Sequence, residues 1–298
     1  MRYVANRDLA EEALSEFDHV WLEPEDSFVG LALLARSRAR RLVVFVHGWG
    51  GSAVETWTGF DRPPMGGWWA ESDLIFVDYK SRRENVTTSA DRLRREIAKY
   101  YPVPNADLLL SLDRKTAIRA DPSEPYEELV IVAHSLGGLV VRRALVDDMD
   151  QWVHSGAIAD NRPALLDATT RLFSPASAGF RPGAALWLVF MACPWLDDVL
   201  HVSRSYANLQ PSSPVIASTK MRTEKYDTTL PQNAALAARI VWADPEDVVI
   251  TEPYTTDGYW STVDKACHPG KSVKHEIVCK PLECYVAPFE FVERGKLP

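Results

Sequence analysis

The sequence ELVIVAHSLGG, residues 128–138, decides the fold. After Glu128, residues 129–133 form an apolar run rich in β-branched side chains, which is typical of a strand buried on both faces. The run ends at His134 and Ser135, and an apolar segment with helical character follows up to residue 148. Small residues on either side of Ser135 allow the backbone to turn sharply from a strand into a helix. We therefore expect a strand, a tight turn and a helix, with Ser135 at the tip of the turn.

Similar runs along the rest of the chain predict a sheet. Buried strands are expected at 42–46, 73–78, 128–133, 186–192 and 238–243. Helices are expected at 66–71, 89–100, 136–148 and 164–173, and Ser89 is a plausible N-cap of the second. Strands that alternate with helices predict an α/β fold, in which helices cover both faces of a mostly parallel sheet.

The chain shows no repeat and no long polar linker, so we expect one domain over residues 1–298. Residues 1–41 precede the first expected strand and form an N-terminal extension. The segments 151–183 and 197–232 interrupt the alternation of strands and helices. Long irregular insertions in a compact domain are usually functional, and here they favour a lid over a binding site.

Composition excludes several classes of protein. With 46% hydrophobic and 25% charged residues the chain can bury a core, and its net charge of −8 argues against a nucleic-acid partner. A secretory leader needs a basic start followed by an apolar segment, and we recognise neither feature in this sequence. The apolar run at 28–35 is too short to span a membrane. We therefore expect a cytoplasmic protein. The arginines between residues 36 and 41 suit a solvated linker, although transient contact with a membrane surface stays open.

The cysteines and their neighbouring histidines do not predict a metal site. None of the four cysteines has CxxC spacing, and no zinc-ligand pattern fits the region around His268 and His275. We expect no metal and no cofactor.

The turn at Ser135 suits nucleophilic catalysis. A serine hydroxyl is a weak nucleophile near neutral pH and must be presented to a base, clear of its neighbours. The usual pattern for such a turn is G-x-S-x-G, and here Ala133 replaces the first glycine while Gly137 is kept. Attack on a carbonyl carbon creates an oxyanion, which the N–H group of Leu136 at the start of a helix can stabilise.

A second N–H donor is expected in the loop HGWGG, residues 47–51, which follows the strand at 42–46. We assign this donor to the backbone of Trp49. A phosphate-binding loop is excluded because no Gly-Lys-Ser/Thr follows.

A histidine must act as the base, because its pKa near ~6.5 lets it accept and return a proton. Where a turn of this kind carries the nucleophile, the serine, the acid and the histidine follow one another in that order along the chain. Only His268 and His275 then remain as candidates for the base. His275 is preferred, since His268 begins a turn. The acid is expected just after the strand at 238–243, where we choose Asp247, with Asp244 and then Glu246 as alternatives.

At four segments the sequence resembles lipase-like serine esterases of the α/β-hydrolase superfamily, and within them the branch of the GPI inositol-deacylase. These segments are VFVHGWGGSAVETW (44–57), VAHSLGGLVVRRAL (132–145), LVFMACPW (188–195) and KHEIVCKP (274–281). The likeness spans about residues 42–292, although CPWL at 193–196 stands where the family often has Thr-Pro-His-Arg-Gly. It implies a Ser-Asp-His triad that hydrolyses carboxylic esters, commonly in lipids, and it supports His275 as the base.

Two alternatives remain open at this point. The same residues would serve an acyltransferase, a thioesterase or an amidase, and a weakly active module that binds a lipid or a protein is a different class. Among ten tryptophans, Trp57 and Trp195 lie beside the motifs, as His47 does, and we expect these three residues to contact substrate. An aromatic cleft of this kind favours acyl chains.

Overall fold

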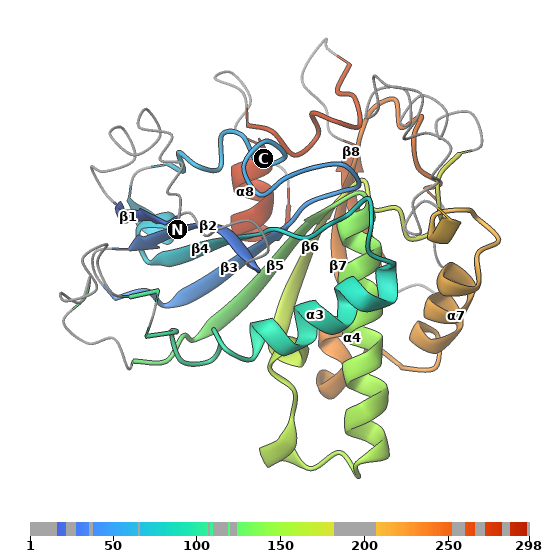
Figure 1. The fold of residues 1–298 in the computed structure, drawn as a ribbon, viewed down its shortest axis with the longest axis horizontal. Coiled ribbons are helices and arrows are strands. Elements are labelled where there is room, and N and C mark those ends of the chain that lie inside the picture. Colours follow the sequence, from blue (N-terminus) through green and yellow to red (C-terminus); the bar gives the residue numbers. More distant parts are fainter. Residues whose placement is uncertain are drawn as a thin grey trace.

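The structure, a computed structural model, contains a sheet with the strand order β1-β2-β4-β3-β5-β6-β7-β8 (Figure 1). It describes residues 17–21, 28–35, 38–64, 66–106, 108–109, 119, 124–181, 207–251, 260–265, 272–281 and 287–296. The strands are β1 (Phe17–Trp21), β2 (Val29–Ala35), β3 (Arg41–Val46), β4 (Ser72–Val77), β5 (Glu128–His134), β6 (Ala168–Phe173), β7 (Ala238–Trp242) and β8 (Trp260–Lys265). All neighbours from β4 through β8 pair in parallel, whereas β1 and β2 add an antiparallel edge.

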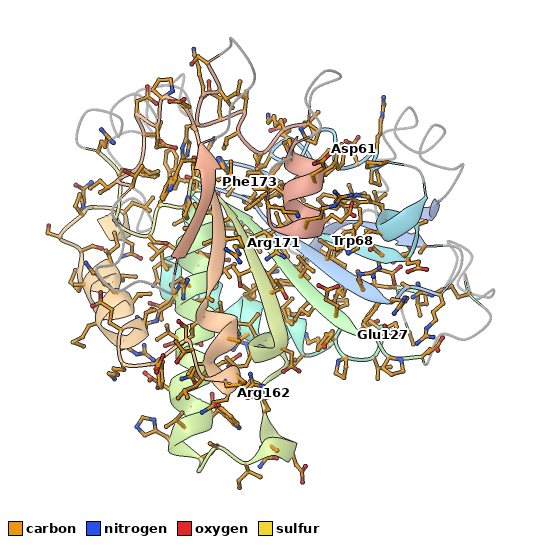
Figure 2. The ribbon with its side chains drawn as sticks, turned by 180° about the vertical axis from the view of Figure 1, so that it is seen from behind. Asp61, Trp68, Glu127, Arg162, Arg171 and Phe173 are labelled. Carbon is orange, nitrogen blue, oxygen red and sulfur yellow. The ribbon has the colours of Figure 1, made fainter. Side chains whose placement is uncertain are left out.

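Helices cover both faces of this sheet. The α-helices are α2 (Gly67–Ala70), α3 (Val86–Ile97), α4 (Leu136–His154), α7 (Pro214–Thr223) and α8 (Ala287–Arg294), and the 3₁₀ helices are η1 (Ala159–Asn161), η2 (Ala164–Asp167) and η4 (Pro231–Leu236). Figure 1 shows α3 and α4 in front of the sheet with α7 beside α4, and the view from behind in Figure 2 shows α8 on the other face. The expected α/β architecture is confirmed, with a mostly parallel sheet between two layers of helices.

Alternating side chains of the central strands supply two cores. On β3, Leu42 and Val44 pack in the core under α3 and α4, while Val43 and Phe45 pack in the core under α8. This follows from the pleat, which sends successive side chains to opposite faces. Strands that are apolar at every position are therefore the ones that suit a sheet covered on both sides.

The strands expected at 42–46, 73–78, 128–133 and 238–243 are present, as are the helices that begin near 66, 89 and 136. The N-cap of α3 is Asn85, whose side chain accepts a hydrogen bond from the N–H of Thr88, so the expectation of Ser89 was wrong. The expected helix at 164–173 is instead η2 followed by β6. The strand expected at 186–192 lies outside the described residues.

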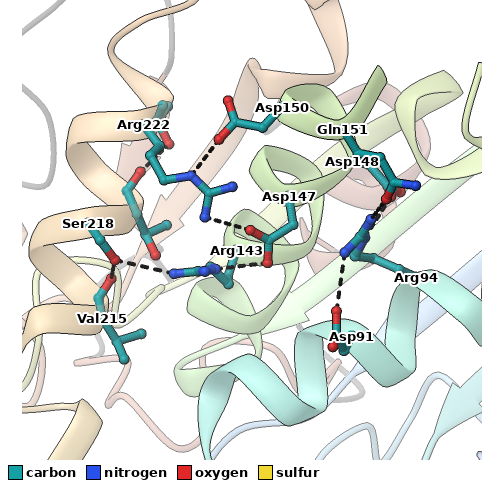
Figure 3. A network of polar contacts seen from close by, with 12 residues as sticks. Asp91, Arg94, Arg143, Asp147, Asp148, Asp150, Gln151, Val215, Ser218 and Arg222 are labelled. Atoms are coloured by element: carbon teal, nitrogen blue, oxygen red, sulfur yellow. Dashed lines mark hydrogen bonds and ion pairs between the residues drawn. The ribbon is translucent and has the colours of Figure 1, made fainter. Parts of the chain in front are cut away.

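The segments expected as insertions contain parts of the fold. Residues 168–173 of the segment 151–183 form β6, which pairs with β5 and β7. In the segment 197–232, α7 packs beside α4, where Arg222 forms ion pairs with Asp147 and Asp150 (Figure 3). The N-terminal extension contributes β1 and β2, residues 17–21 and 29–35. A lid can therefore come only from the remaining parts of these segments, and it stays a prediction.

Within the described ranges, no helix combines the length and the apolar character that a membrane span requires.

Candidate active site

Ser135 lies between β5 and α4 in a backbone conformation that side chains rarely adopt. Its φ is 52° and its ψ is −121°, and 4% of the residue is exposed. Hydrogen bonds hold this conformation: the N–H of Ser135 donates to the carbonyl of Phe173 at 3.1 Å, and its own carbonyl accepts from Ala176 at 2.9 Å. Such strain persists only where the surrounding structure enforces it, and it is concentrated at functional sites.

Two glycines allow other backbone segments to approach this turn. A Cβ atom on Gly137 would lie 2.4 Å from the carbonyl oxygen of Val46, so only glycine permits α4 to begin this close to the end of β3. A Cβ atom on Gly48 would lie 2.9 Å from the Cβ of Ser135. The glycine-rich loop after β3 therefore packs directly against the candidate nucleophile.

His275 lies in the loop 272–281 and is bonded to a carboxylate. Its Nδ1 lies 3.1 Å from each carboxylate oxygen of Glu246, and each of the two side chains is 4% exposed. In the neutral imidazole, Nδ1 then donates its proton to Glu246 and leaves Nε2 as an acceptor. Nε2 is buried and has no hydrogen-bond partner among the described residues. An imidazole held in this way is prepared to accept a proton.

Glu246, and not the expected Asp247, is the carboxylate beside His275. The backbone N–H groups of Val248 and Val249 donate to Oε1 of Glu246 at 3.0 and 3.1 Å, which turns this side chain inward. Asp247 is exposed. The loops that carry the pair are joined because Asp244 and Val273 exchange two backbone hydrogen bonds, and in this bridge Asp244 contributes its backbone.

The pKa of Glu246 reflects its surroundings. Burial by itself would raise the pKa, but hydrogen bonds from His275, Ser174 and the N–H of Val249, together with the charge of His275, lower it to about 2. The carboxylate therefore stays charged over the whole range in which a histidine base works.

His134, which precedes the nucleophile, contacts the base directly. Its Nε2 lies 2.9 Å from the carbonyl oxygen of His275, and because a carbonyl can only accept, Nε2 carries the proton. The two rings are 4.9 Å apart. Burial, and then repulsion by His275, lower the pKa of His134 to about 3, so this imidazole is neutral. Sequence reasoning assigned His134 to the turn and missed this contact.

Ser174 was also missed. It follows β6 directly, and its hydroxyl accepts a hydrogen bond from the N–H of Ala243 at 2.9 Å. Ser174 is also among the groups that lower the pKa of Glu246. The strand before it was not recognised in the sequence, so nothing marked the residue as the end of a strand at the carboxyl edge of the sheet.

The two expected oxyanion donors belong to the two segments that meet at Ser135, the start of α4 and the loop after β3. Leu136 is the first residue of α4, where N–H groups have no carbonyl partner within the helix. Trp49 lies in the loop after β3, next to Gly48 and Gly50. Gly50 donates to the hydroxyl of Ser81 at 3.0 Å, which attaches this loop to the loop after β4.

The expected contacts of His47 and Trp57 with substrate are corrected by their burial. His47 is fully buried and its ring stacks on Tyr79 at 4.3 Å, while the Tyr79 hydroxyl donates to the His47 carbonyl at 2.7 Å. Trp57 is 1% exposed and packs in the aromatic core around Phe45 and Phe173. Both side chains support the loops of the site from inside the protein. Trp195 lies outside the described residues.

The described residues offer little for metal binding. No group of three or more histidine, cysteine or acidic side chains in that part of the chain is arranged to hold an ion. Cys279 is buried, its thiol donates to the carbonyl of Thr56, and burial raises its pKa to about 12. The other cysteines and His268 lie outside the described residues.

No protein-family model matches the chain, and no curated protein matches it in sequence. Among solved structures, phospholipase PlaB from Legionella pneumophila in complex with thio-NAD is 16% identical, with a TM-score of 0.40 over 68% of this chain and 37% of that chain. The monoacylglycerol lipase of Paleococcus ferrophilus is 15% identical, with a TM-score of 0.44 over 86% of this chain and 95% of that chain. An α/β hydrolase from the metagenome of lagoon sediments of Mar Chica, Morocco, is 14% identical, with a TM-score of 0.43 over 93% and 95% of the two chains. The chain thus spans less than two-fifths of the phospholipase.

Proposed function

We propose that this protein is a serine hydrolase that cleaves carboxylic esters through an acyl-enzyme. One observation carries the proposal. Ser135 has a left-handed backbone at the start of a long helix, and the neighbouring residue His134 bonds the backbone of His275, whose ring is bonded to Glu246. A strained serine beside an oriented imidazole is the arrangement that nucleophilic catalysis needs.

The proposed reaction has two steps. The Oγ of Ser135 attacks the carbonyl carbon of the ester while Nε2 of His275 removes the hydroxyl proton. The N–H groups of Leu136 and Trp49 stabilise the oxyanion. The alcohol then leaves with the proton from His275. A water molecule, activated by the same nitrogen, hydrolyses the acyl-enzyme and releases the acid.

Glu246 acts in this scheme as the acid of the triad, in place of Asp247. Its lowered pKa, about 2, keeps it charged, so that it stabilises the imidazolium that forms during attack. Burial of the pair strengthens this attraction.

For the substrate we propose a lipid-like acyl ester. The proposal rests on the sequence resemblance to lipase-like esterases. The side chains of His47 and Trp57 are buried, so they do not support an aromatic substrate cleft. Transient contact with a membrane surface belongs to the same proposal. An acyltransferase, a thioesterase or an amidase would use the same five residues.

A fluorophosphonate probe tests the nucleophile, since it reacts with activated serines. We expect the wild-type protein to be labelled at Ser135 and to hydrolyse p-nitrophenyl esters. The Ser135→Ala variant should be unlabelled, with a kcat lower by ~10⁴- to 10⁶-fold and an unchanged melting temperature. A folded Ser135→Ala variant that keeps more than a tenth of the activity would refute the assignment.

A series of acyl chains tests the substrate class. If an apolar cleft binds the acyl chain, kcat/KM should rise from acetate to medium and long chains, because each buried CH₂ contributes about 0.8 kcal/mol. Vesicles or detergent should raise the rate further. A steady preference for acetate without a response to amphiphiles would instead support a small ester or an amide.

A further inference from the structure

The peptide group between Gly48 and Trp49 contains the N–H that is proposed as the second oxyanion donor. This peptide group lies in the loop after β3 and is trans. In a planar trans peptide the C=O and the N–H point in opposite directions. The direction of the Gly48 carbonyl therefore determines the direction of the Trp49 N–H, and a group that holds the carbonyl also holds the donor.

Two donors bond the carbonyl oxygen of Gly48. Nδ1 of His47 lies 2.8 Å from this oxygen, and the backbone N–H of Gly51 donates to it at 3.2 Å. A carbonyl oxygen can only accept a hydrogen bond, so Nδ1 of His47 carries a proton. The side chain of His47 therefore bonds the same peptide group that offers its N–H to the oxyanion.

The surroundings of the His47 ring keep it in this position. The residue is fully buried, and its ring stacks on that of Tyr79 with the centroids 4.3 Å apart. The backbone N–H of Tyr79 donates to Nε2 at 3.4 Å, and Nε2 also lies 3.4 Å from Oδ1 of Asp78. The neutral ring accepts the first of these contacts, and a protonated ring would form an ion pair in the second. In both states Nδ1 keeps its proton and its bond to Gly48.

This peptide group lies next to the nucleophile. A Cβ atom on Gly48 would lie 2.9 Å from the Cβ of Ser135. In the proposed reaction the Trp49 N–H faces the oxyanion that forms on the carbonyl attacked by Ser135. A flip of the peptide would exchange this N–H for the carbonyl oxygen of Gly48, which would repel the negative charge.

We propose that His47 is a positioning residue for the oxyanion hole. By holding the carbonyl of Gly48, its Nδ1–H keeps the N–H of Trp49 directed toward the oxyanion. This inference rests on the proposed function, because it assigns a role within the same site. A packing role is the alternative, in which the His47 ring only fills the space against Tyr79.

Two variants separate these roles. His47→Asn keeps a donor near the position of Nδ1 and removes the ring, whereas His47→Phe keeps a ring and removes the donor. If His47 positions the peptide, His47→Phe should lower kcat by about 10²- to 10³-fold with little change in KM, as is typical when one oxyanion donor is lost. His47→Asn should stay within about tenfold of the wild type. If the ring only packs, His47→Asn should be the more damaged of the two.

A trifluoromethyl ketone gives a second readout, because the hydroxyl of Ser135 adds to its carbonyl and the adduct carries an oxyanion. Such a transition-state analogue should bind His47→Phe more weakly by the same factor by which kcat/KM falls. Trp152→Phe is the matched control. It also removes a ring N–H that donates to a carbonyl, here that of Ile158 at 2.9 Å, in the last turn of α4 and away from Ser135. This variant should keep the kcat and the inhibitor affinity of the wild type.

NMR spectroscopy observes the peptide group itself and needs no turnover. The sequence contains only two Gly-Trp pairs, Gly48–Trp49 and Gly67–Trp68. A protein with ¹³C in its glycine carbonyls and ¹⁵N in its tryptophans therefore gives two signals from coupled amides, and Trp68→Phe assigns them by removing one. The carbonyl frequency of Gly48, which responds to hydrogen bonding, should shift in His47→Phe and stay close to the wild type in His47→Asn. The Gly67 signal should stay unchanged in both.

Two results would overturn the inference. One is a kcat within about twofold of the wild type in His47→Phe, with unchanged affinity for the ketone. The other is a Gly48 carbonyl signal that is the same in His47→Phe and in the wild type. If His47→Phe does not fold, a loss of kcat of about 100-fold or more in folded His47→Asn would also overturn it. If the wild-type protein neither hydrolyses esters nor reacts with the fluorophosphonate, the proposed function fails, and the NMR signal alone decides whether His47 holds the peptide.

Discussion

Glu246 lies within a turn, and its direction depends on the backbone N–H groups of Val248 and Val249. These donors draw the carboxylate inward, where it bonds His275, while the neighbouring Asp247 is exposed. An exposed carboxylate is surrounded by water and salt, which screen its charge. The buried carboxylate is thus the one that can stabilise an imidazolium.

Substitution of the two acidic residues should therefore have unequal effects. Glu246→Gln keeps the size of the side chain and removes its charge, so kcat should fall by ~10³- to 10⁴-fold. Asp247→Asn is the matched control and should leave kcat close to wild type. Steady-state hydrolysis of a p-nitrophenyl ester measures both. A severe loss in Asp247→Asn alone would return the acid to Asp247.

The residues of the candidate site differ in how visible they are in the sequence. The position of Ser135 and Leu136 at a turn from a strand into a helix can be predicted, because these elements follow one another within a short stretch. Glu246 cannot be chosen over Asp247, because the inward direction of a side chain depends on the hydrogen bonds of its turn. His47 is misassigned for a related reason, since its ring is covered by Tyr79, 32 residues further along the chain.

At the scale of secondary structure, the apolar strands were predicted and β6 was not. Its sequence, ATTRLF, contains Arg171, which suggests a solvated face rather than a buried strand. In the structure Arg171 is buried against Gly295 at the end of α8, and burial lowers its pKa to about 10 (Figure 2). The C-terminal end of a helix favours a positive charge. No local pattern can reveal this, because α8 lies more than a hundred residues later.

Helices α3, α4 and α7 are joined by a network of ion pairs (Figure 3). Arg222 on α7 lies 2.6 Å from Asp147 and 2.6 Å from Asp150, both on α4, and Tyr226 also bonds Asp150. Arg94 on α3 reaches Asp148 on α4 at 2.6 Å. The arginine and aspartate side chains are largely shielded from water, so these pairs contribute more than exposed ones.

Loss of Arg222 should destabilise the protein. Arg222→Met keeps the apolar part of the side chain but leaves two shielded carboxylates without this partner, which should lower the free energy of unfolding by about 1–3 kcal/mol. Arg95→Met is the control, because Arg95 on α3 is exposed. Urea denaturation measures both variants. Equal changes in the two would mean that the network contributes no more than a surface charge.

For the whole molecule, the buried titratable groups of the site couple stability to pH. The pKa of Glu246 is lowered from 4.5 to about 2 on folding, and that of His134 from 6.5 to about 3. In both cases the unfolded chain binds a proton at a higher pH than the folded chain does. The free energy of unfolding must then fall as the pH decreases, first below 6.5 because of His134 and further below 4.5 because of Glu246.

The interval between pH 6.5 and pH 4.5 isolates His134, because Glu246 contributes little there. One proton corresponds to about 1.4 kcal/mol per pH unit, and the unfolded histidine is half protonated at pH 6.5, so His134 should account for a loss of about 2 kcal/mol across this interval. His134→Gln keeps a donor for the His275 carbonyl and cannot titrate, so its unfolding free energy should vary less with pH. His154→Gln, at an exposed histidine near the end of α4, should keep the wild-type slope. Urea denaturation at several pH values compares the three proteins. If His134→Gln has the same slope as the wild type, His134 does not remain neutral in the folded protein.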